Sequence, residues 1–245
     1  MENESTQIIF GLRHKRTFGL WDKIGATVDS LVALNGTNFF PQELFINIDW
    51  TGDGRAAKVR DKNDDFSVRI DMDNIVLSYN KNSHWNFKDE ELASMFNEIC
   101  STILPLINSL DKIDRIGIVD VTEFNYSQNA AKIISDALLS IRLEKAIVDT
   151  CEIRAIYKVP AKKSFLLKDR DDYSTIIIEV SSKKKEGQNI TYDPDLLRVS
   201  LDFQYYFIPS GKYVKELVPD HYARYKKNRE ELLLEKLKKL YNPST

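Results

Sequence analysis

The sequence has few of the residues that mark metal, redox or nucleotide sites. Its 245 residues include three histidines, two cysteines and nine glycines. The histidines are scattered, without His-x-His or His-Glu-x-x-His spacing, and the cysteines match no metal-binding or redox motif. The glycines form neither a phosphate-binding loop nor a dinucleotide-binding fingerprint, and no Gly-x-Ser-x-Gly motif is present. We therefore expect no metal and no cofactor.

A large net charge and long apolar runs are also missing. Thirty-five basic and thirty-seven acidic residues give a formal net charge of −2, so no overall field draws the protein to nucleic acid or to an anionic membrane. No run approaches the roughly 20 apolar residues that span a bilayer, and the first six residues do not form a targeting signal. Cys100 and Cys151 lie in apolar contexts, which predicts two buried thiols in a reducing compartment. We expect a soluble, cytoplasmic protein without a membrane partner.

Hydrophobic periodicity predicts groups of strands separated by helices. Residues 21–34 and 89–110 have the three-to-four apolar spacing of amphipathic helices. Between residues 44 and 79, short extended runs alternate with turn sequences, which predicts an antiparallel meander. The other predicted elements are strands at 7–12, 115–125, 152–159, 174–181 and 199–208, a helix capped by Ser127, and a basic closing helix from about Pro219 to Tyr241.

This order predicts an α+β fold with a mainly antiparallel sheet and long amphipathic helices packed on one face. A doubly wound parallel fold would alternate strand and helix throughout. The plan of strand, helix, further strands and long helix occurs twice, although no residue-level repeat accompanies it. Two similar halves, residues 1–112 and 113–245, are therefore a hypothesis, and we expect them to form one compact unit.

One group of charged residues is compatible with a Mg²⁺-dependent nuclease. Asp171, or its neighbour Asp172, precedes a strand that carries Glu179, and Lys183 follows that strand. The arrangement resembles restriction-endonuclease-like families, in which the strand carries Glu-x-Lys beside Mg²⁺. Here Glu179 and Lys183 are four residues apart, about 13 Å along a strand, which is too far to serve one metal without a bend. We favour a structural interpretation, with Glu179 on the solvent side of a strand and Lys183 at the start of a basic loop.

Basic residues form a second candidate surface, for nucleic acid. The candidates are Lys183, Lys184 and Lys185 in one run, and Arg224, Lys226 and Lys227 on the closing helix. These side chains could neutralise phosphates. However, glutamates are interleaved with the helical lysines and form intrahelical pairs such as Glu235 with Lys239. A solvated charged face is therefore the favoured interpretation of the closing helix.

Three segments resemble a sporadically distributed, uncharacterised prokaryotic family. A long helix introduced by Trp85 leads to the strand sequence Arg115-Ile116-Gly117, and a closing strand that contains Leu201-Asp202 leads to a helix with His221. The sequence departs from the family pattern at residues 119–121 and at Gln204, where a second acidic residue is usual. The resemblance implies no particular activity. The sporadic distribution suggests mobile genes or antiviral defence.

The absence of a catalytic motif beside a foldable α+β pattern favours a non-enzymatic interaction protein. We expect a bacterial adaptor or complex subunit, with a possible connection to defence, whose partner is another protein. The contact should involve an exposed sheet edge or the closing helix, because an edge offers unpaired backbone groups and a helix offers an apolar stripe. A nucleic-acid-binding protein and a Mg²⁺-dependent nuclease are the alternatives. The oligomeric state stays open.

Overall fold

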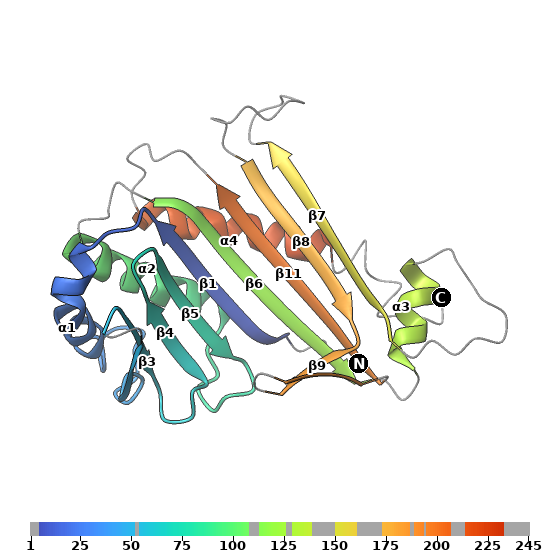
Figure 1. Ribbon diagram of the computed structural model, residues 1–245, viewed down its shortest axis with the longest axis horizontal. Helices are drawn as coiled ribbons and strands as arrows, with labels where there is room; N and C mark the ends of the chain where they lie inside the picture. Colours follow the sequence, from blue (N-terminus) through green and yellow to red (C-terminus); the bar gives the residue numbers. More distant parts are fainter. Residues whose placement is uncertain are drawn as a thin grey trace.

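One large antiparallel sheet dominates the computed structural model, which describes residues 5–51, 54–107, 113–125, 129–138, 150–160, 173–186, 189–193, 195–206 and 214–232. Within these residues the sheet has nine strands in the order β2-β3-β4-β5-β1-β6-β11-β8-β7 (Figure 1). The strands are β1 (Ser5–His14), β2 (Asn47–Thr51), β3 (Ala56–Arg60), β4 (Phe66–Ile70), β5 (Asn74–Asn80), β6 (Ile113–Asn125), β7 (Glu152–Pro160), β8 (Tyr173–Ser181) and β11 (Leu196–Tyr206). The prediction of an α+β fold with a mainly antiparallel sheet is confirmed.

Four helices and a small hairpin complete the described elements. The helices are α1 (Gly19–Val32), α2 (Asp89–Leu106), α3 (Ala130–Leu138) and α4 (Val214–Glu230). The hairpin pairs β9 (Lys183–Glu186) with β10 (Asn189–Tyr192). The loop that we expected to begin at Lys183 is therefore a strand, because pairing with Asn189–Tyr192 supplies the backbone hydrogen bonds of the basic run. Ser127 and the predicted end of the closing helix, residues 233–241, lie outside the described residues.

Aspartate side chains form the tight turns of the meander. Oδ1 of Asp61 accepts hydrogen bonds from the backbone N–H groups of Asp65 and Phe66, at 2.8 and 3.2 Å, between β3 and β4. Oδ1 of Asp71 accepts one from the N–H of Asp73, at 3.2 Å, between β4 and β5. Such turns select aspartate because its carboxylate can replace a backbone acceptor. They fix short connections, and short connections make the successive strands antiparallel.

The two faces of the sheet differ in burial. Phe10 on β1 contacts Phe96 of α2, with ring centroids 5.6 Å apart, and Phe203 on β11 contacts Tyr225 of α4 at 5.4 Å. The side chains of Phe10 and Phe203 are buried, and Figure 1 draws α2 and α4 behind the sheet. We call this side the covered face. Full burial of a large apolar side chain contributes about 1.5–3 kcal/mol, so the covered face is a main source of stability.

The opposite side, which we call the open face, is less buried. Ile9, Gly11, Gly117 and Gln204 alternate with buried neighbours along their strands and are only partly buried. The register places Gly11 of β1 opposite Gly117 of β6, at the pairing that joins the two predicted halves. The division into halves stays a prediction.

Both cysteines are buried and free, as predicted. Burial raises the pKa of the Cys100 thiol, which makes this thiol unreactive. Within the described part of the chain, every helix is too short or too polar to cross a bilayer.

Candidate functional site

The open face is hollow where β1 pairs with β6. A Cβ atom built on Gly11 would meet no atom of the described residues within 4 Å beyond its own chain neighbours, whereas one on Gly117 would lie 3.5 Å from Cγ of Gln204. The hollow is a cavity of about 130 Å³, which we call the glycine cavity; Arg115, Asp202 and Gln204 are among its lining residues. A water molecule takes up about 30 Å³ in the liquid, so this volume corresponds to about four waters. Drug-sized ligands occupy roughly 300 Å³ or more, so only a small ligand fits.

Three side chains of β11 form a hydrogen-bonded row along the cavity. Asp202, Gln204 and Tyr206 are two residues apart, so a strand directs all three to the same face. Nε2 of Gln204 donates to Oδ2 of Asp202 at 2.6 Å, and the Tyr206 hydroxyl donates to Oε1 of Gln204. These bonds hold the amide in one orientation and leave Oδ1 of Asp202 for another donor.

Asp202 is the most unusual group of the cavity. Oδ1 is buried and has no hydrogen-bond partner within the described residues. Burial raises the pKa of the Asp202 carboxyl, while the hydrogen bond from Gln204 and the charges of Arg115 and Arg154 act in the opposite direction. A buried acceptor without a partner is costly, so this oxygen favours a donor from a bound molecule.

A second row on the open face consists of two stacked tyrosine rings with a cationic side chain at each end. The rings of Tyr206 and Tyr173 are nearly parallel, with centroids 4.7 Å apart and an interplanar angle of 9°. The Arg115 guanidinium lies 5.7 Å from the Tyr206 centroid, and the Lys158 ammonium lies 5.7 Å from the Tyr173 centroid. Nη1 of Arg115 also lies 3.5 Å from the Tyr206 hydroxyl. Cation–π attraction therefore positions Arg115 beside the glycine cavity.

The predicted nuclease residues are placed only in part. Asp171 lies outside the described residues. Glu179 lies on β8 and points to the open face, because it pairs with Ser200, two residues from Asp202. Nζ of Lys183 lies 2.5 Å from Oε1 of Glu152, and this contact raises the Lys183 pKa. Across the described ranges, His, Cys, Asp and Glu form no group of three that could hold a metal ion. The nuclease stays a prediction.

Several nucleic-acid candidates have partners within the chain. Nζ of Lys226 lies 2.9 Å from Oε1 of Glu90, and the Arg224 guanidinium lies 4.8 Å from the ring centroid of Tyr205. A phosphate would have to compete with these contacts. Lys184 and Lys227 are exposed, and the side chain of Lys185 lies outside the described part of the chain. Nucleic-acid binding stays a prediction.

Two buried polar contacts between α4 and the sheet were not predicted. Asp120 of β6 is 1% exposed, accepts a hydrogen bond from the Tyr225 hydroxyl at 2.7 Å and forms an ion pair with Arg229. Nε2 of His221 lies 3.0 Å from the carbonyl oxygen of Phe203, and burial lowers the His221 pKa to about 4. The one signal in the sequence is the acidic Asp120 within an apolar strand. Both contacts attach α4 to the covered face.

Exposed apolar side chains gather around β2, at one edge of the sheet. Ile46, Ile48 and Trp50 alternate along this segment and are all exposed, Trp50 to 52%. The N–H of Ile46 donates to the carbonyl oxygen of Arg60, so the pairing with β3 continues to this residue. We call Ile46, Ile48 and Trp50 the β2 edge patch.

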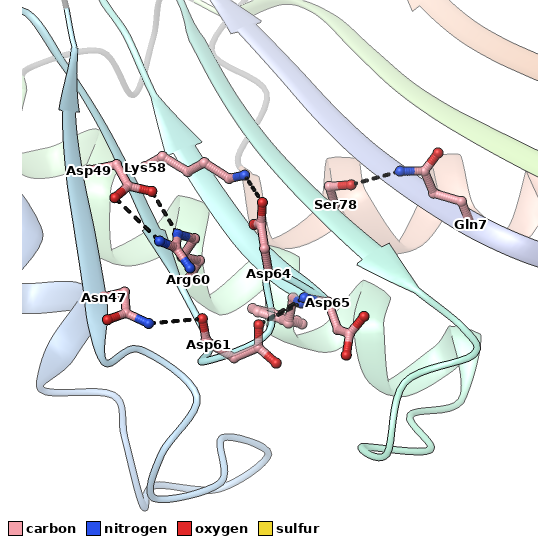
Figure 2. Close-up of polar contacts among 10 residues, drawn as sticks. Gln7, Asn47, Asp49, Lys58, Arg60, Asp61, Asp64, Asp65 and Ser78 are labelled. Carbon is pink, nitrogen blue, oxygen red and sulfur yellow. Dashed lines mark hydrogen bonds and ion pairs between the residues drawn. The ribbon is translucent and has the colours of Figure 1, made fainter. Parts of the chain in front are cut away.

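The other side of β2 is polar and internally paired. Figure 2 shows Nε of Arg60 in contact with Oδ2 of Asp49, at 2.6 Å, and Nδ2 of Asn47 donating to the carbonyl oxygen of Asp61. These polar side chains bind partners within the protein. They therefore do not prevent another strand from approaching β2. Within the described residues β2 pairs only with β3, so one side of its backbone is unpaired.

Comparisons with known proteins add no relative. No protein-family model matches the chain, and no curated protein matches it significantly. Function is therefore inferred from the geometry of the β2 edge patch and the glycine cavity.

Proposed function

We propose that this protein is a non-enzymatic interaction protein that binds another protein at the β2 edge patch. The observation that carries this proposal is the row of exposed apolar side chains, Ile46, Ile48 and Trp50, on an edge strand. Contiguous exposed apolar surface on a folded protein is typical of interaction sites, and aromatic residues often dominate the binding energy at such sites. Action as a bacterial adaptor or complex subunit in the cytoplasm belongs to the same proposal.

The partner contributes an extended segment that pairs with the unpaired side of β2. Backbone hydrogen bonds to such an edge supply affinity, and side chains on alternate positions supply specificity. The partner's apolar side chains would pack on Ile48 and Trp50. The polar side of β2 is already satisfied by the contact between Asp49 and Arg60, so partner binding breaks no ion pair.

The proposal includes the finer architecture, in which α2 and α4 cover one face of the sheet and two similar halves meet at its centre. The sheet order supports it, because the first strands of the halves, β1 and β6, pair with each other, and the last strands, β5 and β11, lie directly outside them. Each half then ends in a helix, and α2 contacts α4. Within the part of the chain that the structure describes, such an architecture leaves the open face and both sheet edges available for binding.

The test compares two edges of the same sheet. The double variant Ile48→Lys and Trp50→Lys alters the β2 edge patch, and Ile156→Lys on the opposite edge strand β7 is the matched control, because Ile156 is also 52% exposed. Tagged wild-type protein and both variants are used for quantitative co-purification from the native host, and the partner is then purified and titrated directly. We expect the β2 variant to weaken partner binding at least tenfold, which corresponds to about 1.4 kcal/mol, and the control to retain it.

Two results would contradict the proposal. One is that both variants lose the partner to the same extent, or that neither variant loses it. The other is a wild-type dimer in size-exclusion chromatography with light scattering that the β2 variant converts to a monomer, because the occupant of the β2 edge would then be a second copy of this chain. Far-UV circular dichroism of each variant verifies that it is folded.

A further inference from the structure

The glycine cavity combines a cationic group, an unsatisfied anionic oxygen and a volume for only a few atoms. We propose that it binds a small zwitterion of the amino-acid class, with the ligand's carboxylate at Arg115 and its ammonium group at Asp202. This site is separate from the β2 edge patch. It lies at the centre of the sheet, whereas β2 is an edge strand.

Arg115 provides the anion-binding end of the cavity. Its guanidinium has five N–H donors in a planar fork that matches a carboxylate. Among the described residues its contacts are the Tyr206 ring and the distant Tyr206 hydroxyl, which leave most of these donors for a ligand. The stacked Tyr173 and Tyr206 support the guanidinium from one side, so its position is set before a ligand binds.

Asp202 provides the cation-binding end. Oδ2 is used by the Gln204 amide, and Oδ1 is buried and unpaired within the described residues. An ammonium group in the cavity, which Asp202 lines, would favour the charged carboxylate, whose pKa burial otherwise raises. A ligand with one negative group alone would face the Asp202 carboxylate without compensation, and a simple cation would face Arg115. A zwitterion matches both ends.

The glycine pair makes the space between these ends. Between β11 and β6, Asp202 pairs with Val119, Gln204 with Gly117 and Tyr206 with Arg115. Gly11 of β1 pairs with Gly117. The two glycines therefore lie between the pair that contains Asp202 and the pair that contains Arg115. Any larger side chain at Gly11 would extend into the cavity, because no other described residue lies within 4 Å of its Cβ position. The volume of about 130 Å³ suits a molecule the size of glycine or alanine and excludes nucleotides.

The decisive variants fill the cavity without removing a contact. Gly11→Ala and Gly11→Val place one and three carbon atoms in the empty space, and both residues suit a strand better than glycine. We therefore expect both variants to fold at least as stably as the wild type. Binding should fall several-fold in Gly11→Ala and should be lost in Gly11→Val. A loss of binding in a protein that has not lost stability cannot be attributed to misfolding.

Two charge variants test the roles of the ends. Asp202→Asn and Arg115→Gln should each weaken binding of the zwitterion at least tenfold. Glu123→Gln, on the open face outside the residues that line the cavity, is the matched control and should change binding less than twofold.

The probes are glycine, L-alanine and β-alanine, with acetate, methylammonium and phosphate as ligands of one charge sign. Binding is followed by the amide resonances of Gly11 and Gly117 in ¹⁵N–¹H correlation spectra.

We expect saturable shifts of the Gly11 and Gly117 resonances with at least one zwitterion, and weaker effects with the singly charged probes. The proposal is overturned if no zwitterion produces saturable shifts at roughly 10 mM, or if Gly11→Val binds as the wild type does. It is equally overturned if phosphate or acetate binds as tightly as the zwitterions and Asp202→Asn leaves that binding unchanged, because the site would then be a simple anion site.

Discussion

The Tyr225 hydroxyl on α4 donates a hydrogen bond of 2.7 Å to the buried carboxylate of Asp120 on β6, across 105 residues of sequence. Arg229, one turn further along α4, forms an ion pair with the same oxygen, Oδ2. The carboxylate therefore has two partners from one helix, and burial raises the pKa of Tyr225 so that its hydroxyl stays protonated as a donor. This contact determines where α4 lies on the covered face.

Removal of Asp120 should destabilise the protein far more than removal of Tyr225's hydroxyl. In Asp120→Asn the partly buried Arg229 loses its counter-charge, and we expect a loss of about 3 kcal/mol in the free energy of unfolding. Tyr225→Phe removes one hydrogen bond while Arg229 still compensates the carboxylate, so about 1.5 kcal/mol should be lost. Urea denaturation measures both.

The control for this pair of variants is Lys226→Gln on the same helix. Its partner Glu90 is more than half exposed, and so is Lys226, so little change in stability is expected. If Lys226→Gln destabilises the protein as much as Asp120→Asn does, burial is not the reason for the importance of Asp120.

His221 should make the protein less stable as the pH falls from about 6.5 to about 4. Burial lowers the pKa of His221 in the folded protein to about 4, while the unfolded chain has the ordinary value of 6.5. Above pH 6.5 the imidazole is neutral in both states. Between the two values the unfolded chain binds a proton that the folded protein does not, so stability decreases with falling pH, by about 3 kcal/mol over the full interval.

The measurement is urea denaturation of wild type and His221→Gln at several values between pH 7 and pH 4. Glutamine keeps a donor for the carbonyl oxygen of Phe203, with which Nε2 of the histidine makes its bond. We expect the variant to lose most of the pH dependence and to retain a smaller part from His14, whose pKa burial also lowers. His84→Gln, at an exposed position, should keep the wild-type pH profile. An unchanged slope in His221→Gln would contradict the assignment.

Asp61 should be the most sensitive residue of the meander. Its carboxylate is 1% exposed and accepts bonds from the N–H groups of Asp65 and Phe66 and from Nε1 of Trp85, the last at 2.7 Å. Asp61→Ala leaves three donors without this acceptor, and we expect a loss of about 3 kcal/mol.

Trp85→Phe and Asp64→Asn separate the contributions to that turn. Trp85→Phe removes one of the three donors and should cost clearly less than Asp61→Ala in thermal unfolding. Asp64 is in the same turn, but its ion pair with Lys58 is exposed, so Asp64→Asn should have little effect. A larger effect of Asp64→Asn than of Asp61→Ala would rule out the buried carboxylate as the anchor of the turn.

Local patterns predicted many of the elements well. The strand β7 begins at Glu152 and α2 begins at Asp89, both as predicted, because turn residues and acidic first-turn residues act over a few positions. The prediction of a basic loop beginning at Lys183 was wrong, because the strand there depends on pairing with Asn189–Tyr192. Local charge could not show that pairing.

The candidate sites depend on long-range register, which a single sequence does not specify. Arg115 and Tyr206 pair across 91 residues, and Gly11 meets Gly117 only because β1 pairs with β6. Arg115, Gly117 and Asp202 carry the sequence resemblance described above, yet nothing in their spacing predicts a common cavity. The β2 edge patch could not be predicted either, because alternating apolar residues indicate a buried face when the strand order is unknown.

The same substitution, glycine to alanine, should have opposite effects at Gly36 and Gly25. Gly36 has φ +75°, a left-handed conformation that costs a residue with a Cβ about 1–2 kcal/mol, and its Cβ would lie 2.4 Å from Oε1 of Gln42. Gly25 lies within α1 with nothing within 4 Å of its Cβ position, so alanine should stabilise the helix there by about 0.5–1 kcal/mol.

The double variant Gly36→Ala and Gln42→Ala distinguishes backbone strain from the contact with Gln42. The glutamine amide is at the end of a flexible side chain and can move, so the left-handed backbone should be the main cause of the loss. We therefore expect Gly36→Ala to lower the free energy of unfolding by about the same amount in the wild type and in Gln42→Ala. Urea denaturation of the four proteins measures this. Full recovery of stability in the double variant would show that the contact with Gln42, and not the conformation of residue 36, requires glycine at this position.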